Sequence, residues 1–78
     1  MDMILSLLTK QFPEYDFTTS DDFISDGYLD SYAIIILITE IENLYNILID
    51  PLDIIPENFM SVISIVNLIN KSGGNIIK

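Results

Sequence analysis

The serine at position 31 is the residue of this sequence with the clearest chemical use. It ends the segment Gly27-Tyr28-Leu29-Asp30-Ser31, and the apolar residues that follow recur at helical spacing, so its hydroxyl falls in the first turn of a predicted helix. Free backbone N–H groups and the positive end of the helix dipole favour a negatively charged group at such a position. Ser31 is therefore well placed to carry an anionic modification.

The composition of the chain excludes most other chemistry for this serine. The sequence contains no histidine and no cysteine, and no lysine lies near Ser31 to act as its base, so a hydrolase nucleophile is excluded. The same absences remove thiolate zinc sites, disulfides and cysteine nucleophiles. Two pairs of neighbouring carboxylates, Asp26 with Asp30 and Glu40 with Glu42, have no nearby feature that would separate their pKa values for acid–base catalysis. We expect no enzymatic activity.

The acidic residues around Gly27 raise the alternative of a calcium site. An EF-hand loop with this glycine at its sixth position would begin at Asp22 and would place Ile24 at the third ligand position. Ala33 would then occupy the twelfth position, where a bidentate Glu is required. The match fails, and we interpret these acids as a solvated loop surface without a metal.

Short elements on either side must position Ser31. We predict an amphipathic helix over residues 2–11, a long loop with aromatic anchors over 12–29, and a central helix over about 30–46. Prolines at 51 and 56 predict a connector with one or two turns. A last helix, capped by Ser61, is expected to run to Lys71 and to end at Gly73-Gly74. The fold class is all-α, a small four-helix bundle.

The central helix carries the strongest periodicity in the chain. Its apolar stripe consists of Ile34, Leu37, Ile38, Ile41, Leu44, Tyr45 and Leu48. Residues 34–36 alone would also fit a buried strand, but the period continues well past strand length. Asp30 is a good N-cap, and Leu29 can pack on Ile34 as a hydrophobic staple.

The length and the net charge of the chain limit its number of domains and the kinds of partner it can bind. The 78 residues allow one domain, here residues 1–74, with 75–78 as a flexible C-terminal tail. Twelve acidic and three basic residues give a net charge of -9, which opposes binding to nucleic acid or anionic lipid and favours basic partners. The N-terminus lacks the features of a secretory signal, and the longest apolar run, residues 32–38, is too short to span a membrane. We expect a cytoplasmic monomer.

The motif around Ser31 resembles the phosphopantetheine attachment site of acyl and peptidyl carrier proteins. Members of that family carry G-x-x-D-S at the start of their second helix, and Gly27, Asp30 and Ser31 match it. The stretch Ile49-Asp50-Pro51, followed by residues 53–62, is similar to the connector and final-helix entry of stand-alone and peptidyl-type carriers. Together the two matches cover most of the chain at the right separation.

The resemblance implies a function without catalysis. A phosphopantetheinyl transferase would move 4'-phosphopantetheine from coenzyme A onto Ser31, and the thiol of that arm would hold an acyl or aminoacyl cargo as a thioester. The implied partners are this transferase, an acyl- or amino-acid-activating ligase or adenylation enzyme, and a downstream acyltransferase or condensing enzyme. Asp30 would cap the helix and contact the transferase. Gly27 either supplies an unusual backbone conformation or is an ordinary loop glycine.

Departures from fatty-acid carriers lie just after the serine. Tyr32 stands where those proteins usually have Leu, and Ala33 and Ile36 stand where acids are common. By the helical period Ile36 is expected to be exposed, with packing against the connector around residues 52–55 as the alternative. We therefore expect an apolar partner surface, closer to that of peptidyl-type carriers, formed by Leu29, Tyr32, Ile36 and Met60.

A different class of function is also open. The apolar helix that begins near Tyr32 could pair with a partner helix or groove, which would make the chain an unmodified helical interaction module. Whether Ser31 carries a prosthetic group discriminates the two. The sequence does not identify the cargo, and D-alanine is one family possibility among several.

Overall fold

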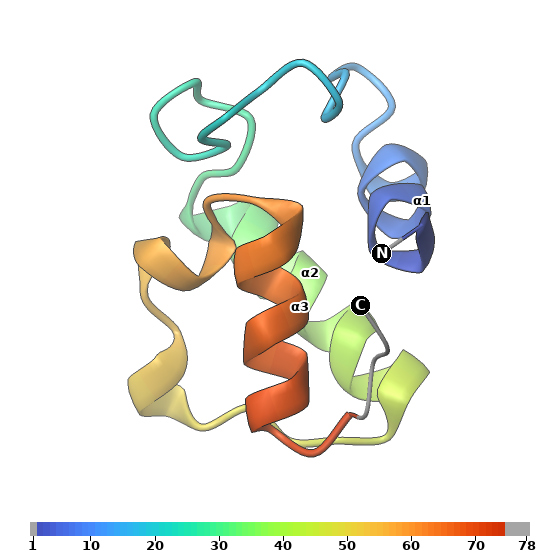
Figure 1. Ribbon diagram of the computed structural model, residues 1–78, viewed down its shortest axis with the longest axis vertical. Helices are drawn as coiled ribbons and strands as arrows, with labels where there is room; N and C mark the ends of the chain where they lie inside the picture. Colours follow the sequence, from blue (N-terminus) through green and yellow to red (C-terminus); the bar gives the residue numbers. More distant parts are fainter. Residues whose placement is uncertain (1, 75–78) are drawn as a thin grey trace.

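The computed structural model describes residues 2–74, and all the regular secondary structure in this part of the chain is helical (Figure 1). Its α-helices are α1 (Asp2–Gln11), α2 (Ser31–Tyr45) and α3 (Val62–Lys71), and two short 3-10 turns, η1 (Pro51–Asp53) and η2 (Pro56–Phe59), join α2 to α3. The three predicted helices are confirmed, with ends that agree with the predicted ones to within a residue. The fourth helix of a bundle is not present as an α-helix in residues 2–74, because the proline-containing connector forms only 3-10 turns. The predicted tail, 75–78, lies outside the described residues.

The helices enclose one apolar core. α3 packs against α1 and η2, while the long first loop arches over one end of the molecule to reach α2 (Figure 1). Every buried side chain in the described part of the chain is apolar. The fully buried ones of largest volume are Phe23, Phe59, Ile4, Leu8, Leu37, Ile41, Ile65, Ile69 and Val66. Each helix thus contributes its apolar stripe, and the loop and connector each add a phenylalanine.

The caps of α2 explain where it begins and ends. The Asp30 carboxylate accepts a hydrogen bond from the Ala33 N–H at 2.8 Å, which confirms the predicted N-cap. At the other end Asn46 adopts a left-handed conformation, with φ 54°, and stops the helix. The predicted stripe is wrong at this end: the Leu44 and Leu48 side chains are 50% and 84% exposed. The chain changes direction at Asn46, and Ile49 is the next residue whose side chain is buried.

The first loop is ordered by aromatic packing and side-chain caps. The Tyr15 and Tyr28 rings stack with centroids 4.6 Å apart, and Phe17 meets Phe23 edge to face at 5.0 Å. The Phe23 N–H donates to the Met60 carbonyl at 2.8 Å, which ties the loop to the connector. The expected aromatic anchors are thus confirmed, and their packing fixes a segment that has no helix.

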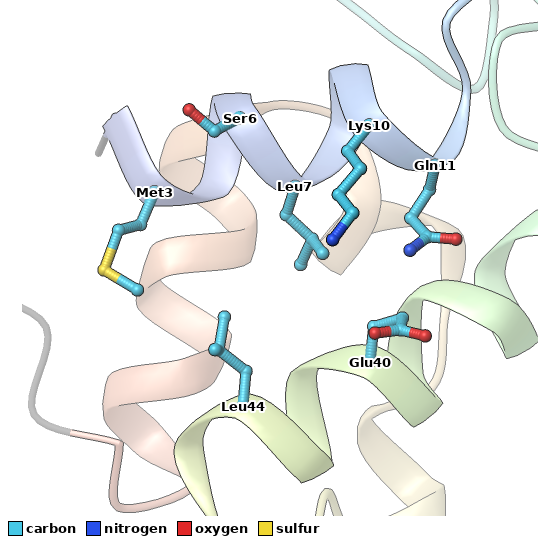
Figure 2. A pocket seen from close by; sticks show the side chains of 7 residues that line it. All are labelled: Met3, Ser6, Leu7, Lys10, Gln11, Glu40 and Leu44. Atoms are coloured by element: carbon cyan, nitrogen blue, oxygen red, sulfur yellow. The ribbon is translucent and has the colours of Figure 1, made fainter.

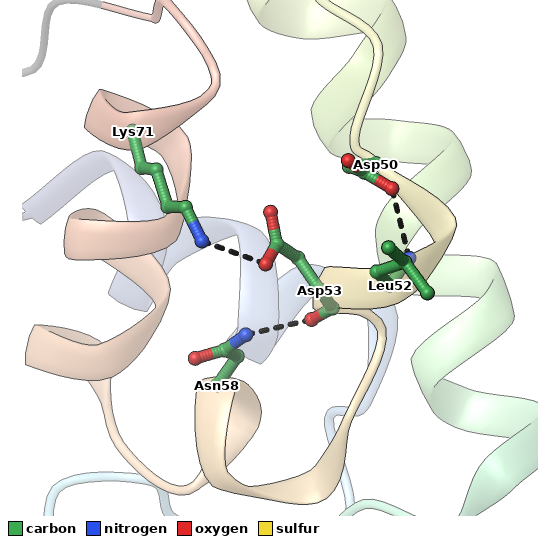
Figure 3. Close-up of polar contacts among 5 residues, drawn as sticks. All are labelled: Asp50, Leu52, Asp53, Asn58 and Lys71. Carbon is green, nitrogen blue, oxygen red and sulfur yellow. Dashed lines mark hydrogen bonds and ion pairs between the residues drawn. The ribbon is translucent and has the colours of Figure 1, made fainter.

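The connector is fastened to α3 through Asp53 (Figure 3). Its carboxylate accepts a hydrogen bond from Lys71 Nζ at 2.7 Å, and its carbonyl accepts one from Asn58 Nδ2, also at 2.7 Å. The Asp50 carboxylate caps η1 by accepting from the Leu52 N–H. Hydrogen bonding to Asp53, together with its charge, raises the pKa of Lys71. These contacts hold the residues between η1 and η2 in place beside α2.

None of the helices in residues 2–74 has both the length and the apolar character needed to cross a membrane.

Candidate attachment site at the start of helix α2

Ser31 is the first residue of α2, and its side chain is exposed to solvent. The backbone turns into the helix at Gly27, whose φ of +77° lies in the left-handed region that favours glycine. Beyond it the Tyr28 and Leu29 N–H groups both donate to the Phe23 carbonyl, at 2.9 and 3.1 Å. Of the two interpretations of Gly27, the structure therefore supports the unusual backbone conformation.

The start of α2 has hydrogen-bonding capacity left over. Asp30 satisfies the N–H of Ala33, and the Asp30 carbonyl satisfies that of Ile34 at 2.9 Å. Within the described residues no acceptor contacts the N–H groups of Ser31 and Tyr32, as is usual for the first turn of a helix. An anion on the Ser31 hydroxyl would lie near these two donors and the positive end of the helix dipole. The Asp30 carboxylate opposes part of this attraction.

An apolar cleft opens directly beside the serine. It has a volume of about 210 Å³ and runs between α2 and the connector. Its lining consists of Ser31, Ile34, Ile35, Ile54, Ile55 and Pro56. Sequence reasoning missed Ile35 as a residue of this site, although its place one helical turn after Ser31 is a usable indication.

The predicted partner residues are placed very differently by the fold. Tyr32 is 73% exposed and adjoins Ser31, as a contact residue must. Leu29 is only 2% exposed, so its side chain is part of the core and does not fit a direct partner contact. Ile36 is half-buried and not exposed as expected, and it lines a hollow formed with residues of the first loop that includes no residue of the connector. Met60 is half-buried, and its carbonyl holds the loop.

The larger hollow between α1 and α2 is separate from this site (Figure 2). It has a volume of about 390 Å³ and is lined by Met3, Ser6, Leu7, Lys10, Gln11, Glu40 and Leu44. Lys10, Gln11 and Glu40 lie at one end, with Met3 and Leu44 toward the other. Ser31 and its neighbours take no part in it.

The loop acids have structural roles that the sequence did not reveal. Asp22 accepts hydrogen bonds from the N–H groups of Ile24 and Ser25, both at 3.0 Å, and from the Ser25 hydroxyl. The bond from the Ser25 N–H is the main cause that lowers the pKa of Asp22. Asp26 accepts from the Ser20 hydroxyl. In the part of the chain that the structure describes, no group of three acidic side chains is arranged to hold a metal ion.

Comparisons with known proteins found no match, whether with family models, with curated proteins or with solved structures.

Proposed function

We propose that this chain is a stand-alone carrier protein that holds an acyl or aminoacyl group on a 4'-phosphopantetheine arm attached to Ser31. The observation that carries the proposal is the exposed Ser31 hydroxyl at the first position of α2, preceded by the Asp30 cap and the left-handed Gly27. No histidine or cysteine is needed, because the thiol of the arm would hold the cargo and separate enzymes would make and break the thioester.

The local chemistry fits a phosphodiester at this serine. The hydroxyl is accessible to a transferase, and two N–H groups of the first turn are free to face the phosphate. The apolar cleft beside Ser31 offers surface on which the uncharged part of the arm can lie. The finer fold belongs to the same proposal: three helices with a long first loop correspond to an acyl-carrier bundle, in which η1 and η2 replace the remaining short helix.

We assign the partner surface to the exposed apolar residues that surround Ser31. Tyr32 and Ile35, at 73% and 61% exposed, lie on α2, and Ile54 and Ile55 of the connector line the cleft together with Ile35. A transferase, an activating ligase and an acceptor enzyme would each have to reach Ser31 across these residues. Such a centre buries apolar area on contact, while the net charge of -9 attracts a basic rim.

The test is intact-mass measurement after incubation with coenzyme A and a broad-specificity phosphopantetheinyl transferase. Wild type is expected to gain one phosphopantetheine group, and Ser31→Ala is expected to gain none. Ser25→Ala is the matched control, because Ser25 is an exposed loop serine that lies outside the motif. If folded wild type stays unmodified with its cognate transferase as well, the carrier proposal is lost.

A second candidate is an unmodified interaction module, favoured by the apolar exposure of Tyr32 and Ile35 alone. It predicts that a partner binds wild type and Ser31→Ala with equal affinity and that no prosthetic group is ever found on the protein.

A further inference from the structure

A second hollow lies next to Ser31 on a different face of α2 from the apolar cleft. Its volume is about 200 Å³, and it is formed where the first loop meets the start of the helix. Aromatic rings and carboxylates share its lining: Phe12, Tyr15, Tyr28 and Tyr32 on the one hand, Glu14 and Asp30 on the other. The stacked rings of Tyr15 and Tyr28, with centroids 4.6 Å apart, form part of this wall.

Among the residues that the structure describes, no basic side chain pairs with the two carboxylates of the hollow. No basic side chain belongs to its lining. Lys71 is paired with Asp53, and Lys10 lines the separate hollow between α1 and α2. Glu14 makes no hydrogen bond or ion pair with any described residue, and Asp30 uses one oxygen for the cap on Ala33 and leaves the other without a partner there. Negative potential therefore remains at the hollow.

We propose that this hollow binds the guanidinium group of an arginine side chain supplied by the enzyme that acts on Ser31. Aromatic faces attract cations, and a guanidinium group both stacks on rings and donates paired hydrogen bonds to carboxylates. The volume falls below the range of about 300–1,000 Å³ that is usual for whole small-molecule ligands, so it suits a single side chain. The net charge of -9 steers a basic partner to this face. Only the identity of the partner rests on the proposed function.

The binding itself can be tested without any modification of Ser31. Blocked arginine, with its amino and carboxyl groups capped, is titrated into the ¹⁵N-labelled protein in the millimolar range, with blocked lysine and blocked leucine as comparison probes. Arginine is expected to shift the amide signals of residues around Tyr15, Tyr28 and Tyr32, more strongly than lysine at equal concentration, and leucine is expected to leave them in place. Equal shifts with lysine, or shifts spread over all acidic surfaces, would show only general ion pairing and overturn the proposal.

Substitutions distinguish arginine binding in the hollow from general attraction by the negative charge of the protein. Glu14→Gln is expected to weaken arginine binding about two- to fivefold, in line with an exposed ion pair, and Tyr32→Leu is expected to weaken it as well. Glu57→Gln is the matched control, since Glu57 is an exposed, unpaired glutamate of η2 outside the hollow. Equal weakening by Glu14→Gln and Glu57→Gln contradicts a defined site.

The same variants connect the hollow to the enzyme. With the transferase or loading enzyme in steady-state assays, Glu14→Gln is expected to raise KM for the protein and to leave kcat unchanged, while Glu57→Gln alters neither. Ser31→Ala is expected to bind blocked arginine as wild type does, so loss of the carrier function and loss of the arginine site give different results. An unchanged KM for Glu14→Gln with every enzyme that modifies or loads Ser31 would overturn the assignment to a partner arginine.

Discussion

Neighbouring isoleucines on α2 line different hollows and differ in their exposure to solvent. Ile35 is 61% exposed and lines the cleft beside Ser31, whereas Ile36 is half-buried and lines the hollow formed with the first loop. The helical period places Ile36 on a face with polar residues and therefore predicts that it is exposed. In the structure Ile36 shares a hollow with residues of the first loop that are distant in sequence, such as Phe12 and Tyr15, and helical periodicity does not report such neighbours.

The Ile35→Glu variant tests the apolar surface beside Ser31. A charge placed at the centre of the apolar surface would have to be desolvated on contact, so kcat/KM for loading by the cognate enzyme is expected to fall about 5- to 30-fold, equivalent to one or two kcal/mol. The melting temperature should stay close to that of wild type. Ile63→Glu is the control, since Ile63 is 56% exposed on α3 and lies outside the cleft. An equal loss in both variants would point to net charge instead of the surface.

Asp30 has a structural role that can be measured apart from any contact with an enzyme. Asp30→Ala removes the side-chain acceptor for the Ala33 N–H and is expected to lower the free energy of unfolding by about 1 kcal/mol. Asp30→Asn keeps an acceptor oxygen and should lose only a few tenths of that amount. Urea denaturation followed by circular dichroism measures both. If Asp30→Asn is as unstable as Asp30→Ala, capping by the side-chain oxygen is not what Asp30 contributes.

The three α-helices were predictable from the sequence, and the segments between them were much less so. Asp30 and Ser61 are capping residues whose hydrogen bonds are local, so the sequence marks where α2 and α3 begin. The end of α2 depends on Asn46 in the left-handed region and on burial of Ile49, and the apolar stripe alone runs past it. Ser31 was placed correctly at the start of α2, but the cleft beside it requires the connector, whose position depends on the distant Lys71.

The turn that precedes Gly27 should respond to acid through Asp22. Its pKa is lowered in the folded state, so its contribution to stability is fully present above the ordinary value of 3.8 and is lost as the pH falls through the lowered value. Asp22→Asn is therefore expected to be less stable than wild type at neutral pH, with the difference vanishing well below pH 3.8. Thermal unfolding measured across this range checks the prediction. Asp21→Asn is the control, because Asp21 makes no hydrogen bond within the described loop, and a difference that persists in acid would contradict the linkage.

The molecule as a whole combines a strictly apolar interior with a strongly negative surface. The buried side chains in residues 2–74 are all apolar, so charge is confined to the exterior and does not disturb the core. Aromatic packing holds the first loop in place, and the contact between Lys71 and Asp53 holds the connector. Together with the Asp30 cap of α2, these interactions shape the surroundings of Ser31. The same excess of acid that would recruit basic partners acts against the compact state by self-repulsion.

Stability should therefore rise with ionic strength. The molecule measures 28 by 24 by 18 Å, while the Debye length is about 30 Å at 0.01 M salt and about 8 Å at 0.15 M. Carboxylates across the whole surface repel one another at the lower concentration and only near neighbours do so at the higher one. If screening restores about 1 kcal/mol, the melting temperature rises by about 4–8 °C for a domain of this size. Differential scanning calorimetry in sodium chloride and in tetramethylammonium chloride measures the rise, which should be the same in both salts because screening does not depend on the cation.

The Lys71→Gln variant tests whether repulsion between carboxylates causes the predicted rise of the melting temperature with salt. The contact between Lys71 and Asp53 is weakened by salt, so in wild type it opposes the general rise. The variant lacks that contact and carries one more net negative charge, and its melting temperature is expected to start lower and to rise more steeply with salt than that of wild type. A melting temperature that falls with salt in both proteins would mean that attraction between charges outweighs repulsion in the folded state, despite the net charge of -9.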